Sequence, residues 1–452
     1  MSAPRFAVLE IGLYERDVRL RMPFRFGVVT LTGAPQAFVR ARIRLADGRE
    51  AEGAAAELLA PKWFDKDPAL TNEDNFAQLR ASLAHARRAY LVGPADTAFG
   101  HSTANYVAGL VAGFGPALVD RALLDALCRA LGTSFYEALR ANAAGLELEG
   151  CEAGAFLGGL APARSIAARH TVGLLDPITS GDVIERLADG LPQTLEEVLA
   201  RYGQRYFKLK LAGDAAADIE RLAAIASALD RSDGPYYATL DGNEQYDDVA
   251  GIAELWCQMK ADPRLARLAA SVLFIEQPIS RRNALARDVA PLAAEIPLLI
   301  DESDDSLEAF PRARALGYTG VSSKACKGLY KSIVNRARCD TWNRDEGGAR
   351  YFMSAEDLTV QPGIALQQDL ALANLLGIAH VERNGHHYVN GMAGLPEAEQ
   401  AAFLKAHPDL YERSHGAVRL AIRDGRIALG SLGCAGYAAA AAPDWNSMRR
   451  VT

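Results

Sequence analysis

Two lysines stand two residues apart in the apolar run "RYFKLKL" (205–211). The pattern predicts a strand, and alternation of side chains along a strand puts Lys208 and Lys210 on one face. Either lysine alone is typical of a solvated edge strand. Two ammonium groups sent the same way out of an apolar strand indicate a reaction site.

Acidic residues and a third lysine follow the next apolar runs. These are Asp241 after "YYATL", Glu276 after "SVLFI", Asp301 after "PLLI" and Lys324 after "GVSS", and successive members are 23 to 35 residues apart. That spacing is about one β/α unit. If the runs are parallel strands of one sheet, their carboxyl ends bring all these groups to the same edge.

Each of these groups also has a structural explanation. Asp241 can open a turn, Glu276 can cap a helix, and Asp301 stands in an N-cap-like run. Lys324, with Lys327 and Lys331 nearby, can belong to a basic helix face. The coincidence of all of them at consecutive strand ends favours the functional interpretation.

Three clustered carboxylates repel one another unless a cation lies between them. Oxygen ligands without nearby Cys or His favour Mg²⁺ first and Mn²⁺ second. Such an ion can hold a substrate carboxylate and stabilise the dianion left when the α-proton is removed. Beside the ion, in a dry pocket, the pKa of a lysine falls, so lysine can act as a base near neutral pH.

The elements that must position these residues form a β-then-α series. We expect eight strands over roughly 230 residues, which predicts a closed (β/α)₈ TIM-type barrel. An open doubly wound sheet is the alternative, but no G-x-G-x-x-G follows an early strand. The predicted strands are 168–174, 205–211, 236–243, 271–278, 297–303, 320–325, 349–356 and 378–384.

The chain before the barrel predicts an α+β capping domain. Residues 5–45 alternate as strands, with a hairpin-like turn at "ADGRE", and 66–145 have helical periodicity. We therefore expect three parts in this α/β protein. They are an N-terminal cap (1–150), the barrel with the metal and acid/base residues (151–390), and a C-terminal segment that returns to the cap (391–452).

Composition limits the partners. The 452 residues carry a net charge of −7, which argues against nucleic acid or an anionic membrane as the main partner. The six cysteines are scattered without a C-x-x-C pair, which is typical of reduced thiols. With neither a signal-peptide pattern nor a long apolar span in the sequence, we expect a cytoplasmic location.

These motifs resemble the enolase superfamily, and within it the muconate-lactonizing-enzyme subgroup of the mandelate racemase/muconate lactonizing enzyme family, which has K-x-K on the second barrel strand. The segments "PFRFGVVTL" (23–31) and "AEGAAAELLAPKWFDKD" (51–67) resemble the two cap loops that cover the substrate. The resemblance implies the following roles: metal ligands Asp241, Glu276 and Asp301; acid/base groups Lys210 and Lys324; an electrostatic partner Lys208; and supporting groups Asn243 and Glu302.

Substrate contacts are predicted at three places: the cap loop at Phe24, Arg25 and Phe26; His170 in the first barrel strand, which alternatively is a core histidine; and Glu356 with Asp357 at the end of the seventh strand. One departure bears on the substrate. Dipeptide epimerases of this subgroup carry Asp-x-Asp near the end of the eighth strand, where this chain has Glu382-Arg383-Asn384.

The resemblance therefore implies a magnesium-dependent isomerase or lyase that removes the α-proton of a small carboxylate to give an enediolate stabilised by the metal. Racemisation, epimerisation or cycloisomerisation would follow. An acid-sugar or hydroxy-acid dehydratase of the same superfamily is one alternative. A barrel that binds metal and ligand without turnover is another. Relatives also lead us to expect a homo-oligomer.

Overall fold

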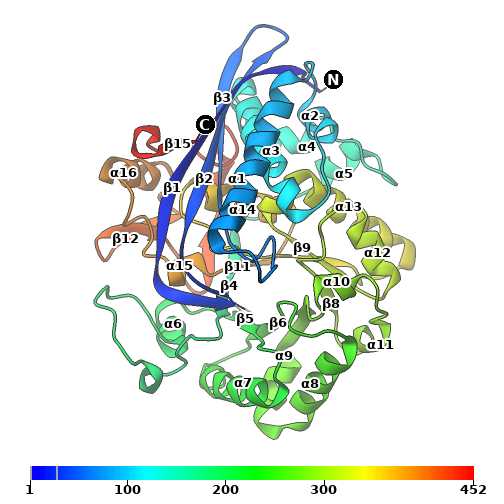
Figure 1. The fold of residues 1–452 in the computed structure, drawn as a ribbon, viewed down its shortest axis with the longest axis vertical. Helices are drawn as coiled ribbons and strands as arrows, with labels where there is room; N and C mark the ends of the chain where they lie inside the picture. The colour runs from blue at the N-terminus through cyan, green and yellow to red at the C-terminus, as the bar shows by residue number, and fades with distance from the viewer. Residues whose placement is uncertain (1–2, 27–28, 452) are drawn as a thin grey trace.

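A computed structural model describes residues 3–26 and 29–451 of the chain (Figure 1). Its N-terminal part contains a four-stranded antiparallel sheet in the order β15-β1-β2-β3. The long strands alternate as the sequence predicts, and the turn between β2 and β3 uses Gly48, whose φ of 88° favours glycine. The strands are β1 (Phe6–Phe26), β2 (Val29–Leu45), β3 (Glu50–Leu58) and β15 (Arg449–Val451).

Helices fill the predicted helical region and pack on this sheet. Helix α3 contacts β2 and β3, and its buried residues run almost continuously from Phe114 to Cys128. Helix α1 packs against α3 and begins with a capping box at Thr71, whose side chain accepts the Asp74 N–H. The helices are α1 (Asn72–Val92), α2 (Ala98–Ala104), α3 (Leu110–Leu131), α4 (Phe135–Arg140) and α5 (Ala153–Gly159).

The predicted barrel is confirmed. Eight parallel strands follow one another around the sheet, and pairing of the last with the first closes it. Every predicted strand overlaps an observed one. The strands are β4 (Ser165–Val172), β5 (Tyr206–Lys210), β6 (Tyr237–Asp241), β7 (Val272–Glu276), β8 (Leu298–Ile300), β9 (Gly320–Ser323), β10 (Phe352–Ala355) and β11 (His380–Arg383).

Helices connect the barrel strands and surround them (Figure 1). In α7 one apolar face is buried, because Ile219, Leu222, Ile225 and Leu229 recur at helical spacing. The helices are α6 (Leu195–Tyr202), α7 (Ala215–Leu229), α8 (Val249–Ala261), α9 (Ala266–Ser271), α10 (Arg281–Ala284), α11 (Ala290–Ala293), α12 (Ala309–Ala315), α13 (Leu329–Glu346) and α14 (Ile364–Leu375).

The C-terminal segment divides between the two parts. β15 pairs with β1 in the cap, but β14 pairs antiparallel with barrel strand β4. The strand-like run at 417–429 is interrupted where Asp424 and Gly425 have φ of 49° and 70°. The elements here are α15 (Gly385–Tyr388), α16 (Glu397–Ala406), β12 (Tyr411–Ser414), β13 (Ala417–Leu420) and β14 (Arg426–Ala428).

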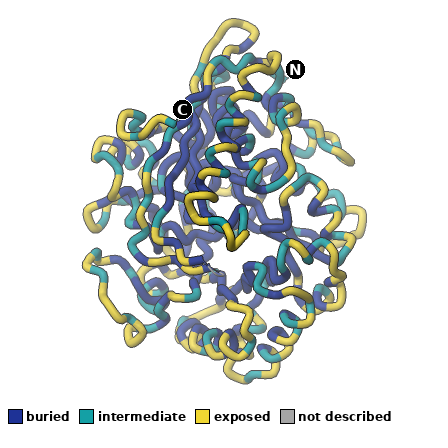
Figure 2. The backbone as a smooth tube through the Cα atoms, in the orientation of Figure 1, coloured by how far each residue is buried: buried dark blue, intermediate teal, exposed yellow. Residues whose placement is uncertain are grey.

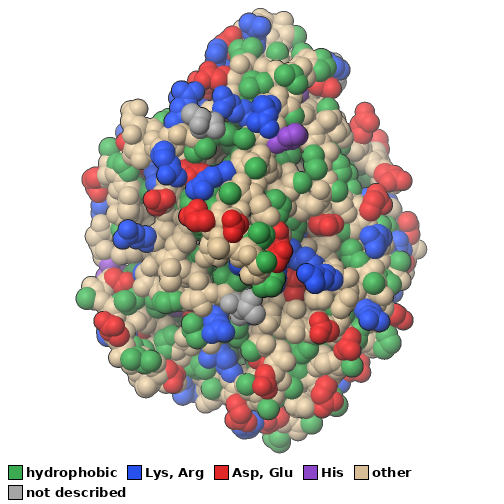
Figure 3. All heavy atoms as spheres, viewed as in Figure 1, with side chains coloured by type: hydrophobic (Ala, Val, Ile, Leu, Met, Phe, Trp, Pro, Cys, Tyr) green, Lys and Arg blue, Asp and Glu red, His purple; other side chains and the backbone are tan. Residues whose placement is uncertain are grey.

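Burial follows this architecture. The barrel strands are buried along most of their length, whereas exposed residues lie on the outer helices and loops (Figure 2). On the face in Figure 3, acidic and basic side chains are interspersed. All six cysteines are free. Within the part of the chain that the structure describes, no helix is long and apolar enough to cross a membrane.

Candidate active site

The predicted acid/base and metal-binding residues lie together at the carboxyl ends of the barrel strands. Lys210, Asp241 and Glu276 are the last residues of β5, β6 and β7, while Asp301 and Lys324 directly follow β8 and β9. All five are buried, with at most 6% of their surface exposed. Strand pairing aligns Lys210 with Asp241 and Asp241 with Glu276.

Lys208 lies inside the barrel, surrounded by carboxylates. Its Nζ is 2.9 Å from Asp241 and 2.8 Å from Glu276. It also contacts two acids from the far side of the barrel, Glu356 at 2.7 Å and Glu382 at 3.0 Å. This ammonium group therefore joins the ends of four strands.

The other two lysines each pair with one predicted metal ligand. Lys210 Nζ donates to Asp241 Oδ2 at 2.6 Å, and Lys324 Nζ donates to Asp301 Oδ2 at 2.5 Å. The Lys324 ammonium also lies 4.4 Å from the ring centre of Trp63, which comes from the cap. β5 and β9 are four strands apart in an eight-stranded barrel, so Lys210 and Lys324 stand on opposite walls.

A second layer of groups fixes these side chains. Gln277 accepts the backbone N–H of Asp301 at 2.8 Å, which ties β7 to β8. A Cβ at Gly242 would lie 2.5 Å from the Pro278 Cα, so only glycine allows this close approach of two strand ends. Asn243 N donates to Asp241 Oδ1 at 2.8 Å, and its side chain lies 3.5 Å from Glu302.

Backbone conformation at the strand ends is unusual. Asn243, Gln277 and Thr359 all have φ between 34° and 58°, a region that non-glycine residues rarely adopt. Each follows a barrel strand at the edge that carries the charged cluster. Such conformations persist only where the surroundings hold them and are concentrated at functional sites.

The pKa values follow from burial and pairing. Burial lowers the pKa of Lys208, but Asp241 and Glu276 outweigh burial and raise it well above its ordinary value. The pKa of Lys324 is raised in the same way, because Asp301 outweighs burial. The lowered lysine pKa expected beside a divalent cation stays a prediction, because ammonium groups are the partners of the carboxylates here.

The pKa values of the three carboxylates shift in different directions. Burial raises the pKa of Glu276 well above its usual range, and the charges of Asp241 and Glu356 add to the effect. Burial would also raise the pKa of Asp241 and Asp301, but Lys208 and Lys210 lower the first, and Lys324 and other lysines lower the second. Glu276 is therefore the acid least compensated by lysine.

We tested whether the residues fit a divalent metal ion. Within residues 3–26 and 29–451, no group of three or more His, Cys, Asp or Glu side chains is arranged to hold a metal. Lysine ammonium groups lie against the carboxylates instead. Two buried oxygens at the rim, Glu302 Oε2 and Asn243 Oδ1, nevertheless accept no hydrogen bond from the described residues. An oxygen-only donor set with unpartnered oxygens fits Mg²⁺ once the ammonium groups withdraw.

A narrow cavity opens above the cluster, between barrel and cap. Its volume of about 20 Å³ is room for one or two water molecules. Phe24 and Phe26 close it from β1, and Phe24 stacks on Tyr388 with ring centres 4.2 Å apart. The cavity is lined by these two phenylalanines together with Leu31, Ala60, Trp63, Lys208, Lys210, Asn243, Lys324, Asp357, Leu358, Thr359 and Asn384.

Three predicted substrate contacts do not line this cavity. Arg25 alternates with Phe24 and Phe26 along β1, so its side chain is exposed. His170 lies between Arg169 and Thr171, both of which bond acids inside the barrel, so it faces outward and packs against His386 and His387. Glu356 lies beneath Lys208 rather than at the cavity, whereas its neighbour Asp357 lines it.

Some side chains around the buried lysines and carboxylates were not predicted from the sequence. Arg169 is fully buried and pairs with Glu356 inside the barrel. Glu382 accepts a hydrogen bond from Thr171 at 2.6 Å and contacts Lys208. Strand alternation could have found Arg169 and Glu382, because each stands on the inward face of its strand. Trp63 comes from a loop and had no such signal.

Comparison with known proteins identifies the fold. No protein-family model matches the sequence, and no curated protein matches it significantly. Among solved structures, the muconate lactonizing enzyme from Pseudomonas fluorescens complexed with muconolactone has a TM-score of 0.64 at 19% identity, covering 98% of both chains. The protein therefore has the fold of the muconate lactonizing enzymes.

Two epimerases have the same fold. The dipeptide epimerase from Cytophaga hutchinsonii, complexed with Mg and D-Ala-L-Val, has a TM-score of 0.62 at 14% identity and covers 98% of this chain and 99% of its own. The L-Ala-D/L-Glu epimerase from Bacillus subtilis has a TM-score of 0.60 at 16% identity, with 95% and 99% covered. Sequence identity at this level relates the folds alone.

Proposed function

We propose that the protein is a magnesium-dependent enzyme of the enolase superfamily that removes the α-proton of a small carboxylate substrate. The observation that carries the proposal is the placement of Lys210 and Lys324. They come from opposite walls of the barrel, line one cavity, and each pairs with an acid of the predicted metal site.

In this proposal Asp241, Glu276 and Asp301 hold Mg²⁺, with Asn243 and Glu302 as supporting groups. Bound Mg²⁺ would neutralise the substrate carboxylate and the charge that develops on it. Lys210 and Lys324 would then lie on opposite faces of the α-carbon. One lysine, as the free amine, takes the proton, and the other, as ammonium, can return a proton to the other face. Lys208 holds the acids in place as their electrostatic partner.

The cavity walls favour isomerisation over acid-sugar dehydration. Phe24, Phe26, Trp63 and Leu358 surround the space above the lysines. Hydroxyl groups on the part of a substrate that contacts these side chains would lack partners, whereas groups elsewhere in the cavity could bond Asn243, Asp357, Thr359 and Asn384. We therefore propose racemisation, epimerisation or cycloisomerisation of a carboxylate whose distal part is apolar, with a dehydratase as the alternative. Phe24 and Phe26 must move to admit it, since the closed cavity holds only water.

Deuterium exchange tests the proposal. The protein, loaded with Mg²⁺, is incubated in deuterated water with a panel of carboxylates that differ in their apolar part, and α-proton exchange is followed by NMR. We expect exchange with at least one apolar carboxylate and its loss when EDTA is added. Metal binding without exchange on any member would favour the non-catalytic metal- and ligand-binding barrel.

Two further properties belong to this proposal. We propose that the protein acts in the cytoplasm, on the grounds of its reduced cysteines, and that it assembles as a homo-oligomer, as the resemblance implies. Size-exclusion chromatography with light scattering tests the second property, and a monomer at micromolar concentration would contradict it.

A further inference from the structure

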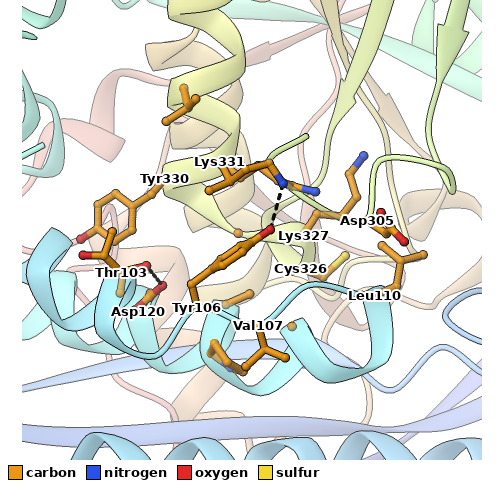
Figure 4. A pocket seen from close by; sticks show the side chains of 18 of the residues that line it. Thr103, Tyr106, Val107, Leu110, Asp120, Asp305, Cys326, Lys327, Tyr330 and Lys331 are labelled. Atoms are coloured by element: carbon orange, nitrogen blue, oxygen red, sulfur yellow. Dashed lines mark hydrogen bonds between the residues drawn. The ribbon is translucent and has the colours of Figure 1, made fainter. Parts of the chain in front are cut away.

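The cap contacts the barrel in two different ways. Beside α13 it leaves a cavity of about 90 Å³, enclosed by α2, α3 and the chain segments after β8 and β9 (Figure 4). Next to this cavity a neutral hydrogen bond joins cap and barrel, from Leu307 N to the Tyr106 hydroxyl at 2.8 Å. Above the buried lysines, residues 59–67 of the cap meet the barrel through charged side chains instead. This segment, the Trp63 loop, carries the ring that lies beside the Lys324 ammonium.

Arg281, the first residue of α10, holds the backbone of the Trp63 loop. Its guanidinium donates to the carbonyl oxygens of Trp63 at 2.8 Å and of Phe64 at 2.9 Å. The same group donates to both carboxylate oxygens of Glu244 at 2.8 Å. Because a guanidinium is planar and has five donors, it fixes the loop and Glu244 relative to each other.

Lys66 adds a second contact from the loop itself. Its Nζ lies 2.6 Å from Glu244 Oε2 and donates to the Asn243 carbonyl oxygen at 2.8 Å. The Glu244 side chain is 5% exposed and is shared by two cations, one from the barrel and one from the cap. Burial would raise the pKa of Glu244, but Arg281 and Lys66 outweigh burial and lower it, so this acid is ionised at pH 7. Glu244, Arg281 and Lys66 form what we call the rim clamp.

A strained turn presents Glu244 to the loop. Asn243 and Glu244 have φ of 42° and 67°, so two successive residues other than glycine adopt the left-handed region. The Glu244 N–H donates to the Gln277 carbonyl oxygen at 2.9 Å, which holds the turn against the end of β7. Strained backbone is concentrated at functional sites. Here it connects the predicted metal ligand Asp241 to the acid of the rim clamp.

On its other side the Trp63 loop is attached to α1 of the cap. The Asn75 side chain accepts the Lys62 N–H at 2.8 Å, and the Gln78 side chain donates to Asp65 at 2.9 Å. These contacts stay within the cap, so they would persist if cap and barrel moved apart. They keep the shape of the loop, whereas the rim clamp sets the position of the loop on the barrel.

We propose that Glu244 is a positioning residue, which acts through Arg281 and Lys66 to seat the Trp63 loop on the barrel and thereby holds the Trp63 ring beside the Lys324 ammonium. A ring in this place attracts the ammonium group and fixes where it lies. The consequence for catalysis rests on the proposed function, in which Lys324 is an acid/base group. The seating of the loop does not.

Fluorine NMR on the full chain tests the seating. All four tryptophans are replaced by 5-fluorotryptophan, and Trp63→Phe assigns the Trp63 resonance. We expect Glu244→Gln to shift or broaden this resonance, because the loop loses its charged attachment, and to leave the other resonances unchanged. Glu220→Gln is the matched control, since Glu220 makes the same bidentate pair with Arg264, at 2.7 and 3.0 Å, on the surface. It should change none of them.

Exchange of the substrate α-proton tests the consequence for Lys324. Glu244→Gln should slow exchange a few-fold, with the larger effect on the enantiomer whose proton Lys324 handles. In a chain that already carries Trp63→Leu it should cause no further slowing, because a residue that acts through Trp63 has no effect once the ring is removed. Rate losses that multiply in the double variant, or that are equal for both enantiomers, would contradict this link to Lys324.

The outcomes separate the seating of the loop from the proposed function. An unchanged Trp63 resonance in Glu244→Gln overturns the proposal, and so does an equal change at all four tryptophans, since Glu244 would then only stabilise the fold. Should Glu244→Gln fail to fold, Lys66→Met removes the cation that the loop supplies and must disturb Trp63 in the same selective way. Expected resonances without exchange on any substrate would refute the proposed function and leave the seating of the loop intact.

Discussion

Two regions of the barrel bury titratable side chains in different ways. At the strand ends, lysines and carboxylates are buried together within about 3 Å of one another, and opposite charge keeps most of them ionised. On the outer side, His170, His386 and His387 pack ring against ring with centres 4.9 to 6.4 Å apart. Both ring nitrogens of His386 lack a hydrogen-bond partner.

Burial is the largest influence on the pKa values of the histidines, and neighbouring positive or histidine groups act in the same direction. Together they lower the pKa of His386 to about 3 and that of His170 and His387 well below the ordinary value, so all three are neutral at pH 7. The comparison shows that burial without an opposite charge discharges a group, whereas burial beside an opposite charge keeps it charged. Only the second arrangement provides groups that can attract a cation or a substrate anion.

The largest effect is expected from removing an acid/base lysine. Lys324→Ala should slow α-proton exchange by about 10³-fold, because the proton loses its acceptor or donor on one face, while Mg²⁺ still binds at least as tightly as in the native protein because Asp301 loses an ammonium partner. NMR exchange and calorimetry measure the two quantities. Lys260→Ala, at an exposed lysine on α8 paired with Glu295, is the control. Native exchange in Lys324→Ala would remove this residue from the mechanism.

Removing the central ammonium should cost stability. Lys208→Met leaves four buried carboxylates without their shared cation, and we expect the free energy of unfolding to fall by about 3–5 kcal/mol. Urea denaturation measures it. Lys260→Met breaks an exposed pair and should cost less than about 1 kcal/mol. Mg²⁺ should restore part of the loss in Lys208→Met. Equal costs in the two variants would mean that the buried cluster is not held by this charge.

The histidine cluster should make the protein less stable in acid. The pKa of His386 is depressed in the folded state, so the unfolded chain binds more protons, and stability is lost as the pH falls from about 6.5 toward 3. Between pH 7 and 5 this histidine contributes a loss of about 2 kcal/mol.

His386→Leu should reduce the difference in unfolding free energy between pH 7 and pH 5 by about that amount. Urea titrations at the two values measure it, and His85→Leu, at an exposed histidine, is the control. If the slope of stability against pH is the same in His386→Leu and native protein, this histidine is not held neutral by burial.

The smallest effect is expected at the cation–π contact. Trp63→Leu removes the ring beside the Lys324 ammonium and should change exchange by a few-fold, which corresponds to about 1 kcal/mol. The change should affect the enantiomer whose proton Lys324 handles more than the other. Trp256→Leu removes a similar contact between a buried ring and the exposed Lys260, neither of which lines the cavity, and should change neither rate. An equal effect on both enantiomers would show that Trp63 acts on substrate entry instead.

Much of the fold could be predicted from local pattern. Apolar runs of strand length, separated by helical stretches, gave all eight barrel strands, since a strand buried on both faces leaves a continuous apolar signature. The strands of the C-terminal segment were harder to predict. β14 joins β4 although the sequence at 417–429 indicates one longer hairpin strand, because a turn at Asp424 and Gly425 redirects the chain.

Site residues could be predicted from the sequence where their place at the end of a strand fixes the position of the side chain. Lys210, Asp241 and Glu276 end their strands, and parallel strands end at one edge. The sequence allows His170 to face either the substrate or the core. The hydrogen bonds that its neighbours Arg169 and Thr171 make inside the barrel show that His170 faces outward. The sequence predicts that Arg25 contacts the substrate from the same cap loop as Phe24 and Phe26. Alternation along β1 instead turns the Arg25 side chain outward.

The sequence by itself determined which charges meet at the barrel rim, because periodicity sets the strands and strand order sets their ends. Only the tertiary structure decided what surrounds those charges. Trp63, above Lys324, comes from a cap loop far away along the chain, and Lys327 reaches Asp301 from the short turn that follows β9. Such contacts depend on how cap and barrel pack, and packing distances are not encoded in any local spacing.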